Sequence, residues 1–125
     1  MQLLLDTHIF LWCVNDDKRL SKRVRQLIQD ASWVYVSSAS IWEITIKARL
    51  DKLEANIPDL QNAIAASGFE ELPILTSHAI ATYDLPAIHN DPFDRMLIAQ
   101  AISEPLRFLT ADKVLQAYSD LVELV

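Results

Sequence analysis

Short apolar runs alternate with stretches of helical periodicity along most of the chain. The apolar run at 3–5 ends abruptly at Asp6, and the segment 7–14 that follows is rich in apolar residues and favours a helix. The same order recurs at 33–36, an aromatic and β-branched run, which is followed by an apolar helical segment at 41–50. The pattern therefore predicts units in which a strand leads directly into a helix.

The rest of the chain continues this alternation with shorter elements. Pro58 and Gly68 are typical of the beginning and the end of a helix, and Asp91-Pro92 of a helix beginning. Further helices are expected at 20–30, 58–67, 77–83, 93–102 and 112–118, and further strands at 69–74, 107–109 and 121–125. The last of these strands is expected at an edge of the sheet.

Strands that alternate with helices predict a parallel sheet, because each parallel neighbour needs a crossover and the crossover helices then cover both faces. The expected fold class is α/β. With 125 residues, 51% of them hydrophobic, the chain suits a single domain over 1–125 with one core. Ligands of such sheets bind beyond the carboxyl ends of the strands, so the strand-to-helix turns are where chemistry is expected.

Charge and composition exclude several classes of function. A formal charge of −6 means that the chain as a whole does not attract phosphate backbones, so RNA would need a local basic patch. The single glycine excludes glycine-rich nucleotide loops, and the single cysteine, Cys13, excludes a disulfide framework. No signal peptide is apparent, and no apolar run approaches the roughly 20 residues that span a bilayer. We expect a cytoplasmic protein without a membrane segment.

Four acidic residues occupy equivalent places in these units, just after a strand or in the helix behind it, although the helix that carries Asp94 does not follow a clearly predicted strand. They are Asp6, Glu43, Asp94 and Asp112. Taken singly, most of them can also be interpreted as helix caps, because Ser40-x-x-Glu43 has the spacing of a capping box and Asp91 precedes Pro92 as an N-cap would. Asp6 fits a capping role less well, since it directly ends an apolar strand.

Taken together, the four acids suggest a metal site. A parallel sheet brings the turns to one edge, where neighbouring carboxylates raise one another's pKa or attract a cation. A set of hard oxygen ligands suits Mg²⁺ or Mn²⁺ better than zinc. Such an ion activates a water and stabilises charge on a phosphoryl oxygen during in-line attack, so phosphodiester hydrolysis is the expected chemistry.

Four segments resemble the successive motifs of VapC-type PIN-domain toxins, in the same order and over nearly the whole chain. They are Leu4-Leu5-Asp6-Thr7-His8, Ser40-Ile41-Trp42-Glu43-Ile44-x-Ile46-Lys47, His89-x-Asp91-Pro92-Phe93-Asp94-Arg95-x-Leu97-Ile98-Ala99-Gln100-Ala101 and Leu109-Thr110-x-Asp112. The third is long and specific, whereas Thr-x-Asp alone is weak.

The resemblance implies a three-layer α/β/α sandwich with a central, mainly parallel sheet. It also implies an Mg²⁺- or Mn²⁺-dependent endoribonuclease that acts on RNA as the toxin of a type II toxin-antitoxin pair, with a cognate antitoxin and a homodimeric assembly. It carries metal binding and catalysis onto Asp6, Glu43, Asp94 and Asp112. Asp91 competes with Asp94 for the third place, and we interpret Asp91 as the cap.

Other residues have supporting roles with open alternatives. His8 is the histidine expected nearest the site, although many relatives have a small polar residue there. Thr110 either hydrogen-bonds a ligand carboxylate or caps the last helix. Glu43 and Lys47, four residues apart, have the spacing of a helix-surface ion pair. The basic stretch could guide RNA or simply be the solvated face of a helix, and consists of Lys18, Arg19, Lys22, Arg23 and Arg25.

The three tryptophans, Trp12, Trp33 and Trp42, are interpreted as core or interface aromatics rather than platforms for bases, because each lies in an apolar pattern. A second function also fits the chain, namely a catalytically silent PIN-like module that binds a basic partner through its acidic edge. The complete set of four acids favours the enzyme.

Overall fold

Five strands form one parallel sheet in the order β3-β2-β1-β4-β5, in a computed structural model that describes residues 1–125. The strands are β1 Gln2–Leu5, β2 Trp33–Ser37, β3 Glu70–Leu72, β4 Arg107–Thr110 and β5 Val122–Leu124. The α-helices are α1 Thr7–Val14, α2 Lys22–Asp30, α3 Ser38–Arg49, α4 Leu60–Ala66, α5 Thr76–Ala81 and α6 Pro92–Ser103. Three 3₁₀ helices complete the fold: η1 Ile57–Asp59, η2 Thr82–Asp84 and η3 Lys113–Tyr118.

The predicted α/β class with a parallel sheet is confirmed, and its centre explains the apolar run at the N-terminus. Leu3, Leu4 and Leu5 are completely buried, as expected for a central parallel strand that is covered on both faces. Their side chains alternate between the two faces, so Leu3 and Leu5 join one core cluster and Leu4 joins the other. The strand β1 therefore divides the core into two halves.

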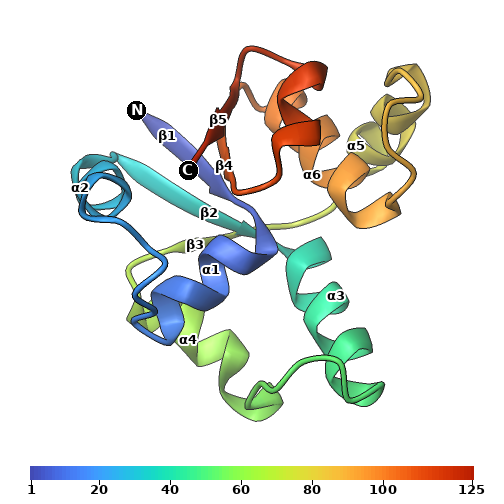
Figure 1. Cartoon of the computed structure of the whole chain (residues 1–125). Helices are drawn as coiled ribbons and strands as arrows, with labels where there is room; N and C mark the ends of the chain where they lie inside the picture. Colours follow the sequence, from blue (N-terminus) through green and yellow to red (C-terminus); the bar gives the residue numbers. More distant parts are fainter.

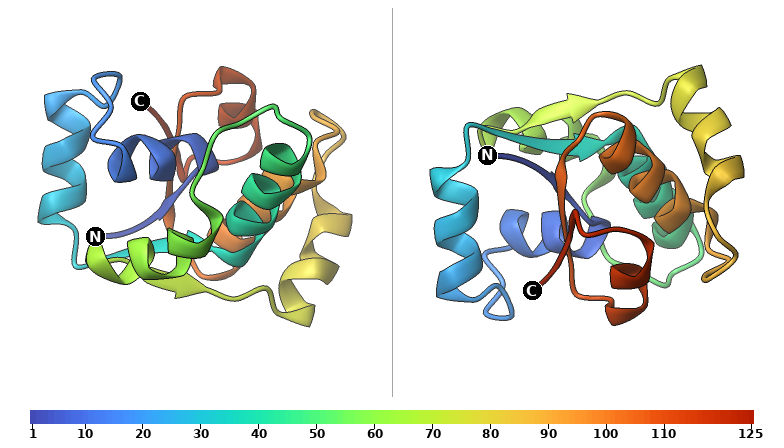
Figure 2. Two further views of the ribbon diagram at one scale, coloured as in Figure 1. Left: turned by 90° about the horizontal axis from the view of Figure 1, so that it is seen from below. Right: turned by 90° about the horizontal axis from the view of Figure 1, so that it is seen from above.

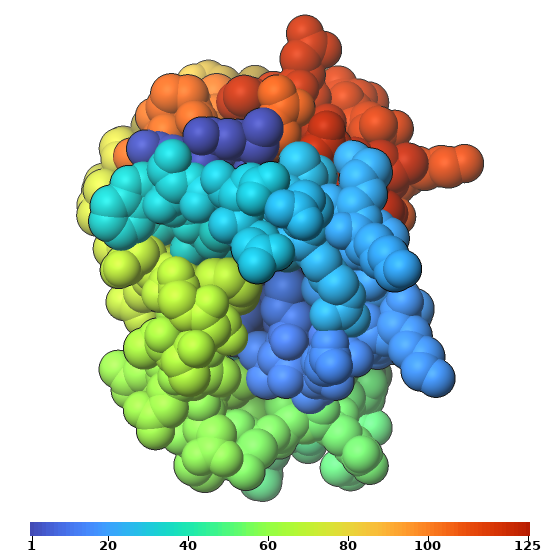
Figure 3. Space-filling view, turned by 90° about the vertical axis from the view of Figure 1, so that its left-hand side faces the viewer, coloured from blue at the N-terminus to red at the C-terminus, as the bar shows by residue number.

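The two core clusters correspond to the two helical layers. Helices α1, α2 and α4 cover one face of the sheet, while α5, α6 and η3 lie on the other (Figure 1). The views from below and above show the same separation (Figure 2). Figure 3 shows the flank on which α2, in light blue, and α4, in yellow-green, lie on either side of the darker blue α1. The result is an α/β/α arrangement.

Most predicted elements are present, with small differences at their ends. The segment at 112–118 is a 3₁₀ helix, η3, that begins after Asp112. The segment at 58–67 consists of η1 followed by α4, and Gly68 ends it with a φ of 77°, a value that a glycine adopts readily. None of the helices has the length and apolar character needed to cross a bilayer.

Candidate active site

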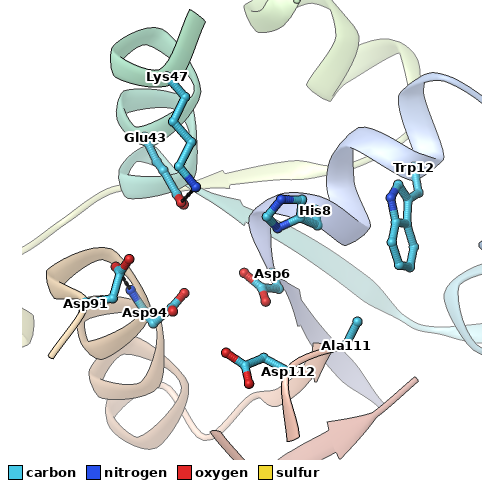
Figure 4. A pocket seen from close by; sticks show the side chains of 9 residues that line it. All are labelled: Asp6, His8, Trp12, Glu43, Lys47, Asp91, Asp94, Ala111 and Asp112. Atoms are coloured by element: carbon cyan, nitrogen blue, oxygen red, sulfur yellow. Dashed lines mark hydrogen bonds and ion pairs between the residues drawn. The ribbon is translucent and has the colours of Figure 1, made fainter. Parts of the chain in front are cut away.

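An open pocket of about 440 Å³ lies where the carboxyl ends of β1 and β4 meet the helices that follow (Figure 4). Its lining residues are Asp6, His8, Trp12, Glu43, Lys47, Asp91, Asp94, Ala111 and Asp112. All four acids expected at the sheet edge are among them, and so are Asp91 and His8. The carboxylates come from the β1–α1 turn, from α3, from the beginning of α6 and from the β4–η3 connection, far apart in sequence.

Asp6 is held rigidly at the end of β1. Its Oδ1 accepts a 2.7 Å hydrogen bond from the Thr7 backbone N–H, so Asp6 is the N-cap of α1, a role that the sequence did not suggest. Its Oδ2 accepts a 2.6 Å hydrogen bond from the Thr110 hydroxyl. The same hydroxyl accepts from the Asp112 backbone N–H at 3.1 Å. The N-cap of η3 is Asp112 and not Thr110. Of the two roles expected for Thr110, the structure therefore shows the hydrogen bond to the Asp6 carboxylate.

Glu43 lies one turn inside α3 and is almost completely buried. Its Oε1 accepts a 2.7 Å hydrogen bond from the Thr7 hydroxyl, and its Oε2 accepts one of 2.7 Å from Lys47 Nζ. The expected pair of Glu43 and Lys47 is therefore present. The expected capping box is wrong, because α3 begins at Ser38 with Ser37 as its N-cap, and this places Ser40 inside the helix.

Asp91 and Asp94 divide the tasks at the start of α6. Asp91 Oδ1 accepts hydrogen bonds from the backbone N–H groups of Phe93 at 2.8 Å and Asp94 at 3.1 Å, which is an N-cap. The Asp94 side chain instead contacts the ring of His89, with 2.9 Å between Asp94 Oδ2 and His89 Nε2. The Asp91 side chain is thus committed to the helix end, and Asp94 is the one that turns toward the other carboxylates (Figure 4).

His89 was not expected as a site residue. One ligand atom each from His89, Asp94 and Asp112 lie within 4.8 Å of one another, which is a spacing that a metal ion can bridge. Tyr118 holds the backbone of His89, because the Tyr118 hydroxyl accepts a 2.8 Å hydrogen bond from the His89 backbone N–H. Arg95 binds the same loop through the carbonyls of Pro86 at 2.9 Å and Thr82 at 3.0 Å. The only signal in the sequence was the place of His89 five residues before Asp94.

Burial and mutual repulsion raise the pKa of two acids of the pocket. Burial, and then the charges of Asp6 and Asp91, raise the pKa of Asp94 to about 7, although the hydrogen bond with His89 opposes this. Burial also raises the pKa of Asp6, against the hydrogen bond from Thr110. The hydrogen bond to Glu43 raises the pKa of Lys47. The pocket therefore holds more negative charge than its side chains neutralise.

A hard divalent cation fits this donor set. Carboxylate oxygens dominate the pocket wall, and Lys47 is the only lysine or arginine that lines it. Such an excess of oxygen donors and negative charge suits Mg²⁺ or Mn²⁺. The raised pKa of Asp94 is consistent with this, because burial and then repulsion from Asp6 and Asp91 cause it, and a bound cation would relieve the repulsion.

The basic stretch is only partly free to contact RNA. Arg19 pairs with Asp17 at 2.8 Å and Arg25 with Asp16 at 2.6 Å. Lys18, Lys22 and Arg23 are exposed and form no salt bridge with a carboxylate. Three positively charged side chains of this stretch are therefore available to contact another molecule.

The tryptophans were expected in the core or at an interface. Trp33 and Trp42 expose 49% and 60% of their surface, so neither is a core residue, and the interface interpretation remains for both. Trp12 is half-buried, and it lines the pocket.

Comparison with known proteins identifies the family. The model of the PIN domain family matches residues 3–121. Ribonuclease VapC22 from Mycobacterium tuberculosis is 30% identical over 118 residues, which cover 93% of this chain and 91% of the relative.

Solved structures show the same fold at lower identity. The chain is similar to a chain of the promoter-bound VapBC2 complex from Rickettsia felis, with a TM-score of 0.74 and 15% identity over 100% of this chain and 99% of that one. It is also similar to a chain of DNA-bound VapBC from Salmonella typhimurium, with a TM-score of 0.70 and 19% identity over 100% and 97%. The chain therefore belongs to the PIN-domain family, and its similarity to VapC22 places it among the VapC proteins.

Proposed function

We propose that the protein is an endoribonuclease that hydrolyses phosphodiester bonds of RNA with Mg²⁺ or Mn²⁺, and that it is the toxin of a type II toxin-antitoxin pair. One observation carries the proposal: carboxylates from four separate segments line one open pocket with a single lysine. The similarity to a protein named as a ribonuclease supports the substrate class.

Asp6, Glu43, Asp94 and Asp112 are the catalytic acids in this proposal, and they provide the ligands for the metal. His89 joins Asp94 and Asp112 as a further ligand or holds the Asp94 carboxylate in place. Bound there, the ion supplies an activated water and stabilises charge on the phosphoryl oxygens. Glu43 is engaged at both oxygens by Thr7 and Lys47, so it acts as the more distant acid of the set.

The chain's own side chains prepare this chemistry. Thr110 orients the Asp6 carboxylate, and the Asp91 cap fixes the first turn of α6, from which Asp94 extends. Near neutral pH, Asp94 holds a proton on its carboxylate in a large fraction of molecules, and this proton must leave when a cation binds. His8, exposed at the pocket rim, is placed to contact the RNA phosphate.

The basic stretch brings the RNA backbone toward the pocket in this proposal. Lys18, Lys22 and Arg23 provide the free charges, and Arg19 and Arg25 contribute through their exposed edges. Because the whole chain has a charge of −6, this attraction is local, and RNA binding should weaken as salt is added.

The proposed partners are a cognate antitoxin and a second copy of this chain. Trp42 and Ile46 on α3 and Leu50, the C-cap of this helix, follow one another at four-residue spacing and expose 60%, 36% and 58% of their surface. An exposed apolar stripe of this kind is typical of a protein interface. The similarity to chains of the two VapBC complexes supports an antitoxin as one partner.

The test is RNA cleavage by purified protein that has been freed of any antitoxin. We expect cleavage with Mg²⁺ or Mn²⁺, none in EDTA, and none by Asp94→Asn. Ser103→Ala, on the exposed end of α6, serves as the matched control and should cleave normally. Cleavage that persists in EDTA or in Asp94→Asn would contradict the proposal, and binding of basic peptides without cleavage would favour a silent binding module.

A further inference from the structure

We propose that Trp12, with Arg19 held across its ring, is a stacking site for one unpaired nucleobase next to the cleaved phosphate. The inference rests on the proposed function, which it deepens by naming the side chains that would contact a base of the RNA. The indole lies at one side of the pocket, with His8 between it and Glu43 (Figure 4).

The position of Trp12 on α1 links it to the reacting end of the pocket. Asp6 caps this helix, and His8 and Trp12 follow one turn apart on the same face. All three line the pocket, with Asp6 buried, His8 exposed and Trp12 half-buried. A strand whose phosphate lies at Asp6 would therefore place a neighbouring nucleotide over the second turn of α1.

Arg19 makes this surface larger and positively charged. Its guanidinium carbon lies 5.0 Å from the centre of the Trp12 ring, within the range of a cation–π contact. Asp17 holds the guanidinium through hydrogen bonds of 3.2 Å to Nε and 2.8 Å to Nη2, and it also accepts from the Arg19 backbone at 2.9 Å. The guanidinium thus lies over one face of the indole and continues it as a flat, positively charged surface, on whose outer side a base would stack.

An aromatic ring has no function in holding a cation between carboxylates. Only Trp12 and Ala111 among the nine lining residues are apolar. Stacking on an aromatic side chain stabilises each bound base by about 1–3 kcal/mol. Only an unpaired nucleotide offers its base face, since the bases of a duplex stack on one another.

Packing against the core of the protein holds the Trp12 ring in place. Trp12 contacts the core cluster beneath α1, so its orientation does not depend on a ligand. Trp33 is more exposed than Trp12 but lies outside the pocket lining, so it serves as the matched control.

The test combines variants of the protein with a missing base in the RNA. Affinity for a labelled single-stranded RNA is measured in the Asp94→Asn background by fluorescence anisotropy, with one abasic position moved along the strand. We expect Trp12→Leu to weaken binding about tenfold, the equivalent of about 1.4 kcal/mol, and Trp12→Phe to weaken it less. Trp33→Leu should bind like the background protein, and affinity for duplex RNA should not change.

The abasic series separates stacking from any general loss of structure. One abasic position should weaken binding to protein with Trp12 about tenfold, and this penalty should disappear in Trp12→Leu. Equal penalties in both proteins, or unchanged single-strand affinity in a folded Trp12→Leu, would overturn the inference. If protein with wild-type Asp94 cleaves no RNA while the stacking penalty persists, the proposed function fails and the base site remains. If Trp12→Leu cleaves with unchanged kcat and KM, only the base site fails.

Discussion

The Thr110 hydroxyl donates a 2.6 Å hydrogen bond to Oδ2 of Asp6, which joins the carboxyl ends of the neighbouring strands β4 and β1. Both residues are buried, and the second oxygen of Asp6 is already used by the Thr7 backbone. The carboxylate is thus oriented before any ligand arrives. Burial raises the pKa of Asp6, and this hydrogen bond opposes that shift by stabilising the ionised carboxylate.

Thr110→Val should lower stability, because it removes this bond and leaves a buried oxygen of Asp6 without a partner. We expect the free energy of unfolding in urea to fall by about 1–3 kcal/mol, and RNA cleavage to fall with it. Thr110→Ser keeps the hydroxyl and should retain most of both. Wild-type stability and activity in Thr110→Val would show that the bond orients nothing.

Stability of the metal-free protein should decrease as pH rises toward neutrality. Asp94 has a pKa of about 7 in the folded chain, above its ordinary value of 3.8, so the folded state binds more protons between these values. The stability contributed by protonated Asp94 is therefore complete below about pH 4 and is lost as pH rises through about 7.

Asp94→Asn should flatten this pH dependence and be more stable than the wild type at pH 8. Melting temperatures measured in EDTA from pH 4 to 8 provide the comparison. A wild-type melting temperature that rises between pH 5 and 8, or the same slope in both proteins, would contradict the assignment of Asp94 as the protonated acid.

Lys47→Met should destabilise the metal-free protein near neutral pH. It removes the cation at 2.7 Å from Glu43 and leaves that buried carboxylate with Thr7 alone. Because the Lys47 side chain is 38% exposed, solvent screens the pair, and the loss should be only about 1 kcal/mol. Lys47→Arg keeps the charge and should be close to wild type. The measurement is urea unfolding with and without Mn²⁺, and Mn²⁺ should restore most of the loss in Lys47→Met.

His89→Ala should weaken binding of Mn²⁺ about tenfold, whether His89 binds the ion directly or only orients Asp94. Isothermal titration at pH 7.5 measures this affinity. His78→Ala is a poor control because His78 is completely buried, whereas Asn90→Ala changes the exposed neighbour and should bind as the wild type does. Equal affinity in His89→Ala would remove this residue from the site.

The sheet and the four acids could be predicted because both depend on local patterns. A central parallel strand is buried on both faces, so Leu3 to Leu5 is a continuous apolar run that stops where the sheet edge begins. Once the strands are parallel, the residues after them must meet at one edge, and this includes Asp6 and Asp112. No side-chain contact was needed for that prediction.

His89 and Trp12 could not be placed in the same way. The position of His89 depends on a loop held by Arg95 and by Tyr118, which is 29 residues away in sequence. The apolar neighbours of Trp12 suggested a core or interface residue, but its exposure depends on where the α1–α2 connection leaves room, which is a tertiary property. The capping role of Asp6 was missed because a residue that ends a strand can also begin a helix without a break.

The central claim is that these scattered carboxylates meet in order to hold one hard divalent cation. The most direct measurement is a crystal structure of the protein grown with Mn²⁺, with data collected for anomalous scattering from manganese. We expect a peak in the pocket that contacts Asp94 and Asp112 and lies beside Asp6. A well-ordered pocket with no peak at saturating Mn²⁺, or a peak bound elsewhere, would contradict the metal centre and the hydrolysis proposed from it.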